Sequence, residues 1–509
     1  MPPRVLTVAR WYPSHDSPGR GSFVADLVAA TRDAGAEHVV ISFDTIRATR
    51  HLADPAAERA RAVAAWATDA APRALLSRPR SWGVPGVPVA RLPVVPVPGA
   101  STPGDEILEH AEALEPFLDR LVPAWRPDVV HAHTGIPDGV AAATAAARHG
   151  IPVVVSEHAS TIEETLRDRE GRRRYLELLD AADVVAVSPA LRARLAAALE
   201  VAEARIGILP NPVQIEGFRP ADGRRVPDEL LWVGSRAGHK GIDVLLRAVT
   251  IVRETRPGAR LRMIGRPRLP EDDDRWRALA AELGIGDAVS LESWAPRGAV
   301  AAAMQRAQVF VHPSPSETFG VVAAEAIAAG LPVAARPSGG VPWIVETAGG
   351  FGAVAGDDTA EALAAAVLAL LEGPPAVDAA DARRRLESAF GPAALARAAL
   401  ARYPDGSDVA TGPAPALPTM SQGPLPSVLV GIERGPTLRA VEALPAEIRR
   451  ELTVITAAGE GMPGEPPGRL VDRDLDADHR QALTAFDAAS AGVGRRLVAR
   501  LGGRSPAAD

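Results

Sequence analysis

The feature that most constrains this chain is an alternation of short apolar runs with helical stretches, repeated in two successive halves. Apolar runs separated by helical sequence predict parallel β-strands that helices cover on both faces. Two such halves predict an α/β fold of two doubly wound domains, with a ligand cleft at the carboxyl ends of the strands. The runs lie at residues 4–9, 38–43, 128–133, 152–158 and 183–188, and then at 229–234, 260–265, 288–293, 308–314 and 332–336.

A chain of 509 residues is too long for one ordinary core, which agrees with a division into domains. We expect a first domain at 1–212 and a second at 213–403. Residues 404–426 are rich in Gly, Pro, Ala and Ser, which predicts a linker. Residues 427–509 predict a small α/β appendage without an assigned function. The stretch 72–104 is rich in proline and glycine and predicts an irregular excursion rather than a regular element.

Composition excludes several classes of function. A formal net charge of −7 leaves no electrostatic footprint for nucleic acid. The absence of cysteine excludes disulfides, thiolate nucleophiles and cysteine metal sites. We find no apolar stretch of signal-peptide length at the start, and no uncharged apolar run of about 18 residues that would span a membrane. A cytoplasmic location is therefore the expectation.

Lys240 is the only lysine among the 56 basic residues. A coding bias toward arginine is one explanation of that scarcity. The other is that Lys240 occupies a site where a planar guanidinium does not fit but a compact ammonium does. Lys240 follows a strand that ends at Gly234, and with Gly241 it begins a helix. An ammonium placed there can neutralise a diphosphate.

Two glutamates flank the start of another predicted helix. Glu317 precedes the helix, and the free backbone N–H groups of a first turn can face an anionic or hydroxyl-rich ligand. Glu325 follows eight residues later, near the same side of that helix. Two carboxylates so placed can hold hydroxyls of two sugars. The alternative is a pair of solvated glutamates that interact with the helix dipole.

These two segments, together with a strand-end histidine and a glycine loop, resemble the large retaining glycosyltransferase family called group 1 or family four. The histidine is His158 in PVVVSEHAS, and the loop at 14–27 contains Gly19 and Gly21. The resemblance covers roughly residues 4–400. It implies the GT-B arrangement of two facing Rossmann-like domains, the first on the acceptor side and the second on the donor side.

The resemblance implies an enzyme of glycan, glycolipid or glycoside biosynthesis, including polysaccharide biosynthesis. It would transfer a hexose from a UDP- or GDP-sugar with retention of anomeric configuration, with no cofactor and no obligatory metal. The acceptor is not identified, lipid-linked acceptors are among the candidates, and peripheral membrane contact stays open. The implied catalytic residues are His158, Lys240 and Glu317. The implied donor-binding residues are Gly21, Gly234, Arg236, Lys240, Glu317, Thr318, Phe319, Gly320, Val321 and Glu325. His131 and His133 are implied on the acceptor side; they share one face of a strand, but no third metal ligand lies nearby in the sequence.

The sequence departs from the family pattern at three positions. Ser235 stands where the family usually has arginine, so either Arg236 takes over its phosphate contact by a local shift or one phosphate contact is missing. Arg266 lies in a Gly-Arg-Pro turn that replaces the usual Gly-Asp-Gly, and Trp343 stands where glutamate is common. These departures keep open a non-catalytic homologue that binds a nucleotide sugar or a partner. A sugar-nucleotide epimerase is a second alternative, which the glutamate pair disfavours.

A basic cluster at 167–174 has two readings as well. It could touch an anionic acceptor or a membrane surface. Acidic residues interleave with these arginines, which favours a solvated helical face.

Overall fold

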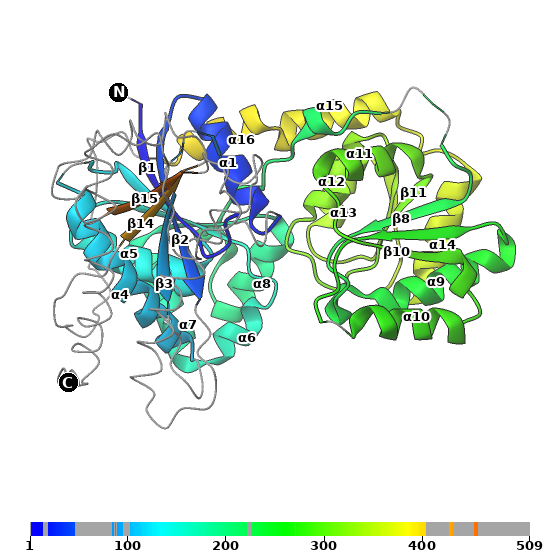
Figure 1. Ribbon diagram of the computed structural model, residues 1–509, viewed down its shortest axis with the longest axis horizontal. Coiled ribbons are helices and arrows are strands. Elements are labelled where there is room, and N and C mark those ends of the chain that lie inside the picture. The colour runs from blue at the N-terminus through cyan, green and yellow to red at the C-terminus, as the bar shows by residue number, and fades with distance from the viewer. Residues whose placement is uncertain are drawn as a thin grey trace, which may run out of the picture.

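The computed structural model consists of two α/β domains, each a sheet of mainly parallel strands with helices on its faces (Figure 1). The predicted fold class is confirmed. Because every strand of the second sheet and most strands of the first are parallel, each connection must cross over the sheet, and the helices provide these crossovers. The structure describes residues 2–13, 19–45, 84–85, 87, 89–94, 102–123, 125–220, 223, 225–269, 271–403, 427–431 and 452–456.

The first sheet has the strand order β15-β14-β3-β2-β1-β4-β5-β6-β7. All its pairs are parallel except β14 with β3. Its strands are β1 (Arg4–Val8), β2 (Glu37–Thr45), β3 (Val89–Val94), β4 (Val129–His133), β5 (Val153–Glu157), β6 (Asp183–Ala186), β7 (Gly207–Ile208), β14 (Ser427–Gly431) and β15 (Leu452–Thr456). Its helices are α1 (Ser22–Asp33), α4 (Pro103–Leu121), α5 (Val140–Ala147), α6 (Ile162–Arg167), α7 (Arg169–Ala181) and α8 (Pro189–Leu199).

The second sheet has the strand order β10-β9-β8-β11-β12-β13 and is parallel throughout. Its strands are β8 (Glu229–Val233), β9 (Arg260–Ile264), β10 (Val289–Glu292), β11 (Val309–His312), β12 (Val333–Ala335) and β13 (Gly352–Val354). The helices of this half are α9 (Ile242–Thr255), α10 (Asp272–Glu282), α11 (Arg297–Arg306), α12 (Val321–Ala328), α13 (Val341–Thr347), α14 (Ala360–Glu372) and α15 (Ala379–Phe390). Short helical turns lie at Gly135–Gly139, Glu203–Arg205, Ile215–Gly217, Gly238–Lys240 and Gly286–Ala288.

The prediction that 72–104 lacks regular structure is wrong in two places. Strand β3 lies inside this stretch, and α4 begins at Pro103. Val89, Leu92 and Val94 of β3 are buried, and β3 pairs in parallel with β2. Burial and pairing with a distant strand therefore outweigh the local proline content, as is usual for β structure.

The two described segments of 427–509 extend the first sheet, whereas the sequence predicted a separate small unit. Strand β14 pairs antiparallel with β3, and β15 pairs in parallel with β14. The expected linker at 404–426 lies outside the described residues.

The last helix before that linker also differs from the predicted domain division. Helix α16 (Pro392–Leu400) packs against α1 of the first domain, although 213–403 was assigned to the second. Beyond it, the Tyr403 hydroxyl is hydrogen-bonded to His131 Nδ1 at 2.9 Å. The chain therefore returns to the first domain before residue 403, since α16 finds an apolar surface on α1.

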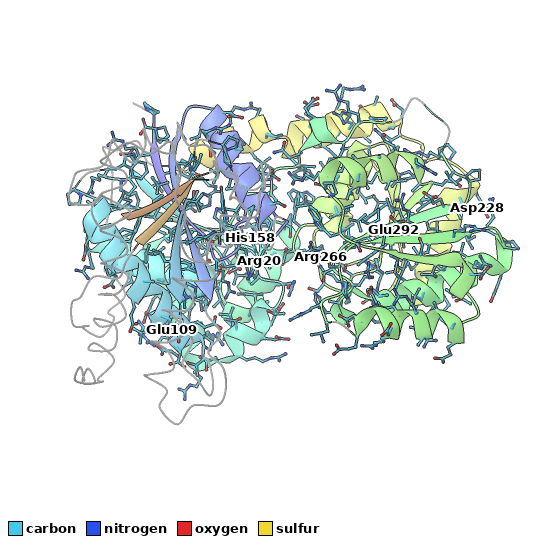
Figure 2. All side chains as sticks on the ribbon, viewed as in Figure 1. Arg20, Glu109, His158, Asp228, Arg266 and Glu292 are labelled. Carbon is cyan, nitrogen blue, oxygen red and sulfur yellow. The ribbon has the colours of Figure 1, made fainter. Side chains whose placement is uncertain are left out.

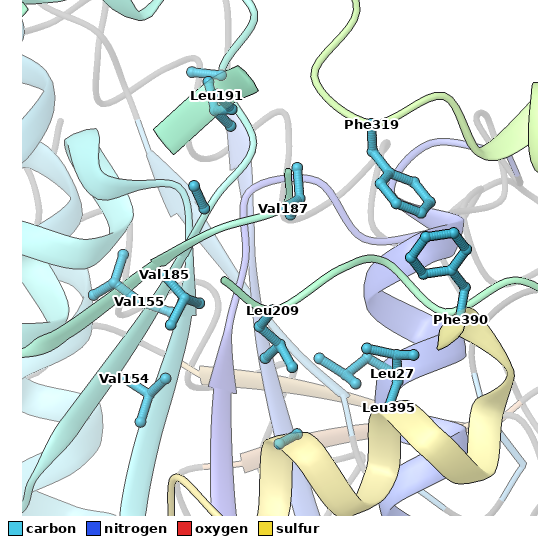
Figure 3. Close-up of a cluster of buried hydrophobic side chains, with 14 of the residues drawn as sticks. Leu27, Val154, Val155, Val185, Val187, Leu191, Leu209, Phe319, Phe390 and Leu395 are labelled. Carbon is cyan, nitrogen blue, oxygen red and sulfur yellow. The ribbon is translucent and has the colours of Figure 1, made fainter. Parts of the chain in front are cut away.

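Apolar side chains join the two domains. Phe319 lies before α12, and its ring centroid is 5.2 Å from that of Phe390 at the end of α15. Both rings belong to one cluster of buried side chains that also contains Leu27, Leu209 and Leu395 (Figure 3). Burial of a large apolar side chain is worth about 1.5–3 kcal/mol, so this cluster contributes substantially to the docking of the domains.

Candidate active site

The carboxyl ends of the strands in both sheets carry the residues that the sequence singled out. In the first domain, His133 ends β4 and His158 follows β5; in the second, His312 ends β11 and Lys240 lies in the turn after β8. His158 and Arg266 lie toward the boundary between the two domains (Figure 2). The strand ends of both halves thus contribute to one region.

Lys240 and Glu317 meet, although 77 residues separate them. Lys240 Nζ donates a hydrogen bond to Glu317 Oε2 at 3.2 Å, and His312 Nε2 lies 3.7 Å from the same oxygen. Burial acts to raise the pKa of Glu317, but the hydrogen bond with His312 and the charge of Lys240 lower it to about 2. Glu317 is therefore a carboxylate at neutral pH, and 21% of its side chain remains exposed to a ligand.

Two glycines shape the backbone that carries Glu317. A Cβ added at Gly339 would lie 1.6 Å from Glu317 O, and one at Gly340 would lie 2.5 Å from Phe319 O. Gly340 N donates a hydrogen bond to Glu317 O at 3.0 Å. Only residues without a side chain allow this approach. The sequence analysis assigned no role to these residues, although a Gly-Gly pair after a strand is a signal for a close backbone contact.

The first domain also holds this loop. Ser188 Oγ donates a hydrogen bond to Thr318 O at 2.6 Å, and Arg194 Nη1 donates one to Ser316 Oγ at 3.3 Å. The Phe319 side chain points into the interdomain cluster, so only its backbone is available to a donor. Gly320 has φ of 105° directly before α12 begins at Val321, which leaves the first-turn N–H groups of α12 at the loop.

Glu325 has a different environment from Glu317. It is buried on α12, and its Oε1 lies 3.7 Å from Arg297 Nε. Burial raises the pKa of Glu325 to about 7 against the opposing charge of Arg297. The two glutamates therefore differ in protonation near neutral pH, and each has its own cation.

Arg297 connects the donor domain to the first domain. Its Nη1 and Nη2 donate to the two carboxylate oxygens of Asp26 on α1, at 2.9 and 2.5 Å. Gln214 Nε2 donates to Asp26 Oδ1 at 3.2 Å as well. Asp26 and Arg297 were not predicted from the sequence, because a local pattern does not show that a charge on one domain meets a charge on the other.

The guanidinium of Arg236 is committed to partners within the second domain and is not presented for the predicted phosphate contact. Its guanidinium is buried and donates to both carboxylate oxygens of Asp273, at 2.6 and 2.8 Å, and to the carbonyl oxygens of Gly265 and Glu292, at 2.6 and 2.7 Å. These bonds occupy four of the five guanidinium N–H groups. Arg236 ties the ends of β8, β9 and β10 together instead. A Cβ added at Gly265 would lie 1.7 Å from Gly234 O, so these strand ends also touch directly.

Trp343 has a structural role. Its ring centroid lies 6.2 Å from that of Phe319 and 4.9 Å from that of Phe390. The tryptophan therefore supports the Glu317 loop from the interdomain cluster.

His131, His133 and His158 of the first domain form a buried, uncharged group. His133 Nδ1 is hydrogen-bonded to His158 Nε2 at 3.0 Å, and His131 is hydrogen-bonded to Tyr403 Oη and Ser156 Oγ, both at 2.9 Å. Burial lowers the pKa of His158 and His131 to about 3 and that of His133 well below its usual value. Both ring nitrogens of His131 have partners within the chain, which leaves neither of them free for the predicted contact with an acceptor.

His158 has one nitrogen to spare. Its Nδ1 is buried and has no hydrogen-bond partner in the described part of the chain. The neighbouring Glu157 carboxylate accepts hydrogen bonds from the backbone N–H groups of His158, Ala159 and Gly135 and from Tyr175 Oη, at 2.6–2.9 Å. Glu157, which the sequence analysis gave no role, thereby fixes the backbone that presents His158.

The glycine loop contributes a close packing contact. Gly21 has φ of 67°, and a Cβ there would lie 1.9 Å from Trp11 O. A Cβ added at Gly19 would lie 3.6 Å from Trp294 Nε1 of the second domain. Residues 14–18 of the predicted loop lie outside the described residues, and a donor contact of Gly21 stays a prediction.

The basic cluster on α6 and α7 is largely paired with its acidic neighbours. Arg173 bonds to Glu170 and Glu177, and Arg172 pairs with Glu200. These pairs favour a solvated helical face. Within the described residues, no three or more His, Cys, Asp or Glu side chains are grouped to hold a metal, and no helix is long and apolar enough to cross a membrane.

Two family profiles match this chain. The profile "Glycosyl transferases group 1" matches residues 221–389, and "Glycosyltransferase Family 4" matches residues 19–216. Among curated proteins, the D-inositol 3-phosphate glycosyltransferase of Acidothermus cellulolyticus is 33% identical over 293 residues, which cover 51% of this chain and 64% of that protein. The enzyme of the same name from Thermobispora bispora is 35% identical over 246 residues, covering 42% and 56%. The chain thus spans less than two thirds of the length of these relatives.

Solved structures agree on the fold. Sucrose-phosphate synthase from Thermosynechococcus elongatus superposes with a TM-score of 0.58 at 20% identity, over 79% of this chain and 98% of that chain. Anabaena HepE, solved in complex with UDP, gives a TM-score of 0.56 at 16% identity, over 78% and 98%. At these identities the likeness establishes the two-domain GT-B fold.

Proposed function

The chain belongs to the group 1 glycosyltransferases, and on that premise we propose that it transfers a hexose from a UDP- or GDP-sugar to an acceptor hydroxyl with retention of anomeric configuration. The observation that carries the proposal is the meeting of Lys240 with the ionised Glu317 beside the start of α12. An ammonium, a partly exposed carboxylate and first-turn N–H groups are the groups that a sugar diphosphate requires.

The roles follow from the charges. Lys240 and the first-turn N–H groups of α12 stabilise the negative charge that develops on the leaving diphosphate. Glu317, as a carboxylate, accepts hydrogen bonds from hydroxyls of the hexose, and Glu325 faces the ribose. His158 lies beside the reacting carbon and uses its unpaired Nδ1 toward the sugar.

The proposed transfer needs no covalent intermediate on the enzyme. The bond between the anomeric carbon and the diphosphate oxygen breaks while the acceptor oxygen bonds to that carbon from the same face. The proton of the acceptor hydroxyl passes to the departing phosphate. No residue has to act as a nucleophile in this scheme.

The relatives suggest which substrates to try first. HepE has been solved with UDP and with UDP-glucose, which supports a UDP-linked donor. The curated relatives are named for D-inositol 3-phosphate, which makes that polyol phosphate the first acceptor to test; lipid-linked acceptors follow. The reaction is assigned to the cytoplasm, which cell fractionation checks.

A donor panel tests the proposal. Thermal shift is measured with UDP- and GDP-sugars, because a ligand that binds the folded state raises the melting temperature. Release of free nucleoside diphosphate is then measured with and without acceptor. Binding and acceptor-dependent release are expected. Binding without release of nucleoside diphosphate would support the non-catalytic alternative, and interconversion of donors without acceptor would support the epimerase. A chain that neither binds a donor nor releases nucleoside diphosphate would refute the proposal.

A further inference from the structure

The loop between β9 and α10 exposes two arginines without acidic partners. Arg266 and Arg268 are both exposed, and within the described residues neither side chain pairs with a carboxylate. By contrast, Arg262 on the same strand pairs with Glu292. The charges of Arg266 and Arg268 are therefore available to an anion.

The register of the two strands places Arg266 next to Ser235. Val233 of β8 is opposite Ile264 of β9, and beyond the strands Arg236 is opposite Pro267. The offset is the same at both points, so Ser235 is opposite Arg266. Neighbouring strands are about 4.8 Å apart and opposed residues of parallel strands point to the same side, so an arginine side chain from 266 spans the distance to Ser235. Ser235 and Arg266 are both exposed, which agrees with a shared side.

A tryptophan holds this arginine at the boundary between the domains. The Arg266 guanidinium carbon lies 5.7 Å from the ring centroid of Trp294, which is 42% exposed. Trp294 in turn lies next to Gly19 of the first domain, and Figure 2 places Arg266 on the side of the second domain that faces the first. Stacking uses the face of a guanidinium and leaves the N–H groups in its plane for a ligand.

The charges of the other residues at the site leave room for a further cation that binds the diphosphate. Lys240 is offset by the ionised Glu317, and Arg236 is committed to Asp273. A diphosphate therefore meets no net positive charge from these four residues.

We propose that Arg266, in the loop after β9 and opposite Ser235 in the turn after β8, binds a phosphate of the nucleoside diphosphate and so completes the site with Lys240. The inference rests on the proposed function, because it presumes a nucleoside diphosphate ligand. It assigns to Arg266 the contact that Arg236 does not make. It also assigns Trp294 as the residue that positions the guanidinium.

Binding of nucleotides to the full chain tests this inference. Calorimetry is run with UDP and GDP and, for the better of the two, with the corresponding nucleoside. Arg266→Ala is expected to weaken binding of the diphosphate by about tenfold or more, because a charged hydrogen bond is worth about 1.5–3 kcal/mol, and to leave nucleoside binding unchanged. The affinity of Arg266→Lys for the diphosphate is expected to lie between those of the parent chain and Arg266→Ala, since lysine keeps the charge but not the planar fork.

A rescue and a matched control make the test specific. Ser235→Arg in the Arg266→Ala background returns a guanidinium to the same place from the neighbouring strand and should restore diphosphate binding. Arg260→Ala, on the same strand at its amino end, should have no effect.

Each other outcome overturns the inference. Unchanged diphosphate affinity in Arg266→Ala, with normal binding by the parent chain, refutes the role of Arg266 and leaves the proposed function standing. An equal loss for nucleoside and diphosphate assigns Arg266 to the base instead of the phosphate. A parent chain that binds no nucleoside diphosphate at all refutes the proposed function together with the inference.

Discussion

The two domains carry opposite kinds of chemistry at the carboxyl ends of their strands. On the first domain, His131, His133 and His158 are buried, uncharged and hydrogen-bonded, two of them to each other. On the second, Lys240 and Glu317 form an ion pair. A charged group suits a diphosphate, so on the proposed function charge stabilisation belongs to the second domain, while His158 of the first domain acts at the reacting carbon.

The domains are nevertheless coupled. Asp26 of α1 pairs with Arg297 of α11, and Arg297 also lies near Glu325. The buried rings of Phe319 and Phe390 connect the loop that carries Glu317 to the first domain. Any change in how the domains meet therefore acts on the loop that carries Glu317.

The largest effect is expected from Lys240→Ala. Removal of the ammonium takes away stabilisation of the leaving diphosphate, and the rate of transfer should fall by about a thousandfold or more. Circular dichroism should show an unchanged fold, because Lys240 is partly exposed. Lys240→Arg is the matched variant that keeps the charge; full activity in Lys240→Ala would contradict the assignment of charge stabilisation to the second domain.

His158→Ala tests the neutral side. Loss of the free Nδ1 beside the reacting carbon should lower turnover by about a hundredfold, while donor binding, measured by calorimetry, stays near that of the parent chain. His149→Ala, which removes a histidine that pairs with Asp119, is the control. If His158→Ala weakened donor binding and left turnover intact, the division of roles between the domains would be wrong.

Phe390→Ala tests the connection. A large buried ring replaced by a methyl group costs about 3–5 kcal/mol, so chemical denaturation should show a destabilised chain. Leu269→Ala is the control, because Leu269 is 51% exposed and such changes cost under about 0.5 kcal/mol. Equal stability of the two variants would show that the cluster does not hold the domains together.

The smallest effect concerns pH. The pKa of His38 and His158 is lowered to about 3 and that of His110 to about 4, all by burial, from an ordinary value of 6.5. Between these pKa values the unfolded chain binds more protons than the folded chain. Each histidine's contribution to the free energy of unfolding is therefore present above about pH 6.5 and is lost as the pH falls, by under about 1 kcal/mol between pH 7 and 6. Glu325 acts oppositely: its pKa is raised to about 7, so its contribution is lost as the pH rises through 7.

Hydrogen exchange measures whether the first domain is more sensitive to acid than the second. After correction for intrinsic rates, peptides from β4 and β5 should lose protection between pH 7 and 5 before peptides from β11 do. The buried Asp138 opposes the histidines, because burial raises its pKa to about 7, but it is one group against several. Earlier loss in β11 would contradict the predicted acid sensitivity of the first domain.

Much of the fold follows from local pattern. The apolar runs predicted ten strands of the two sheets, and each overlaps a strand of the structure. The pattern missed β3, which lies in a proline-rich stretch typical of a loop, because pairing with β2 stabilises it from a distance. It also misplaced α16, since a helix sequence does not specify which of two domains it packs against.

For the site, the sequence by itself determined the chemistry available: one lysine, two glutamates eight residues apart, and glycines where the backbone must come close. Only the tertiary structure decided which groups meet. It paired Lys240 with Glu317, turned Arg236 into the strand ends, joined Asp26 to Arg297 across the domains and occupied both nitrogens of His131. The physical reason is that side-chain direction and long-range contact depend on burial and packing over the whole molecule, which short-range patterns do not encode.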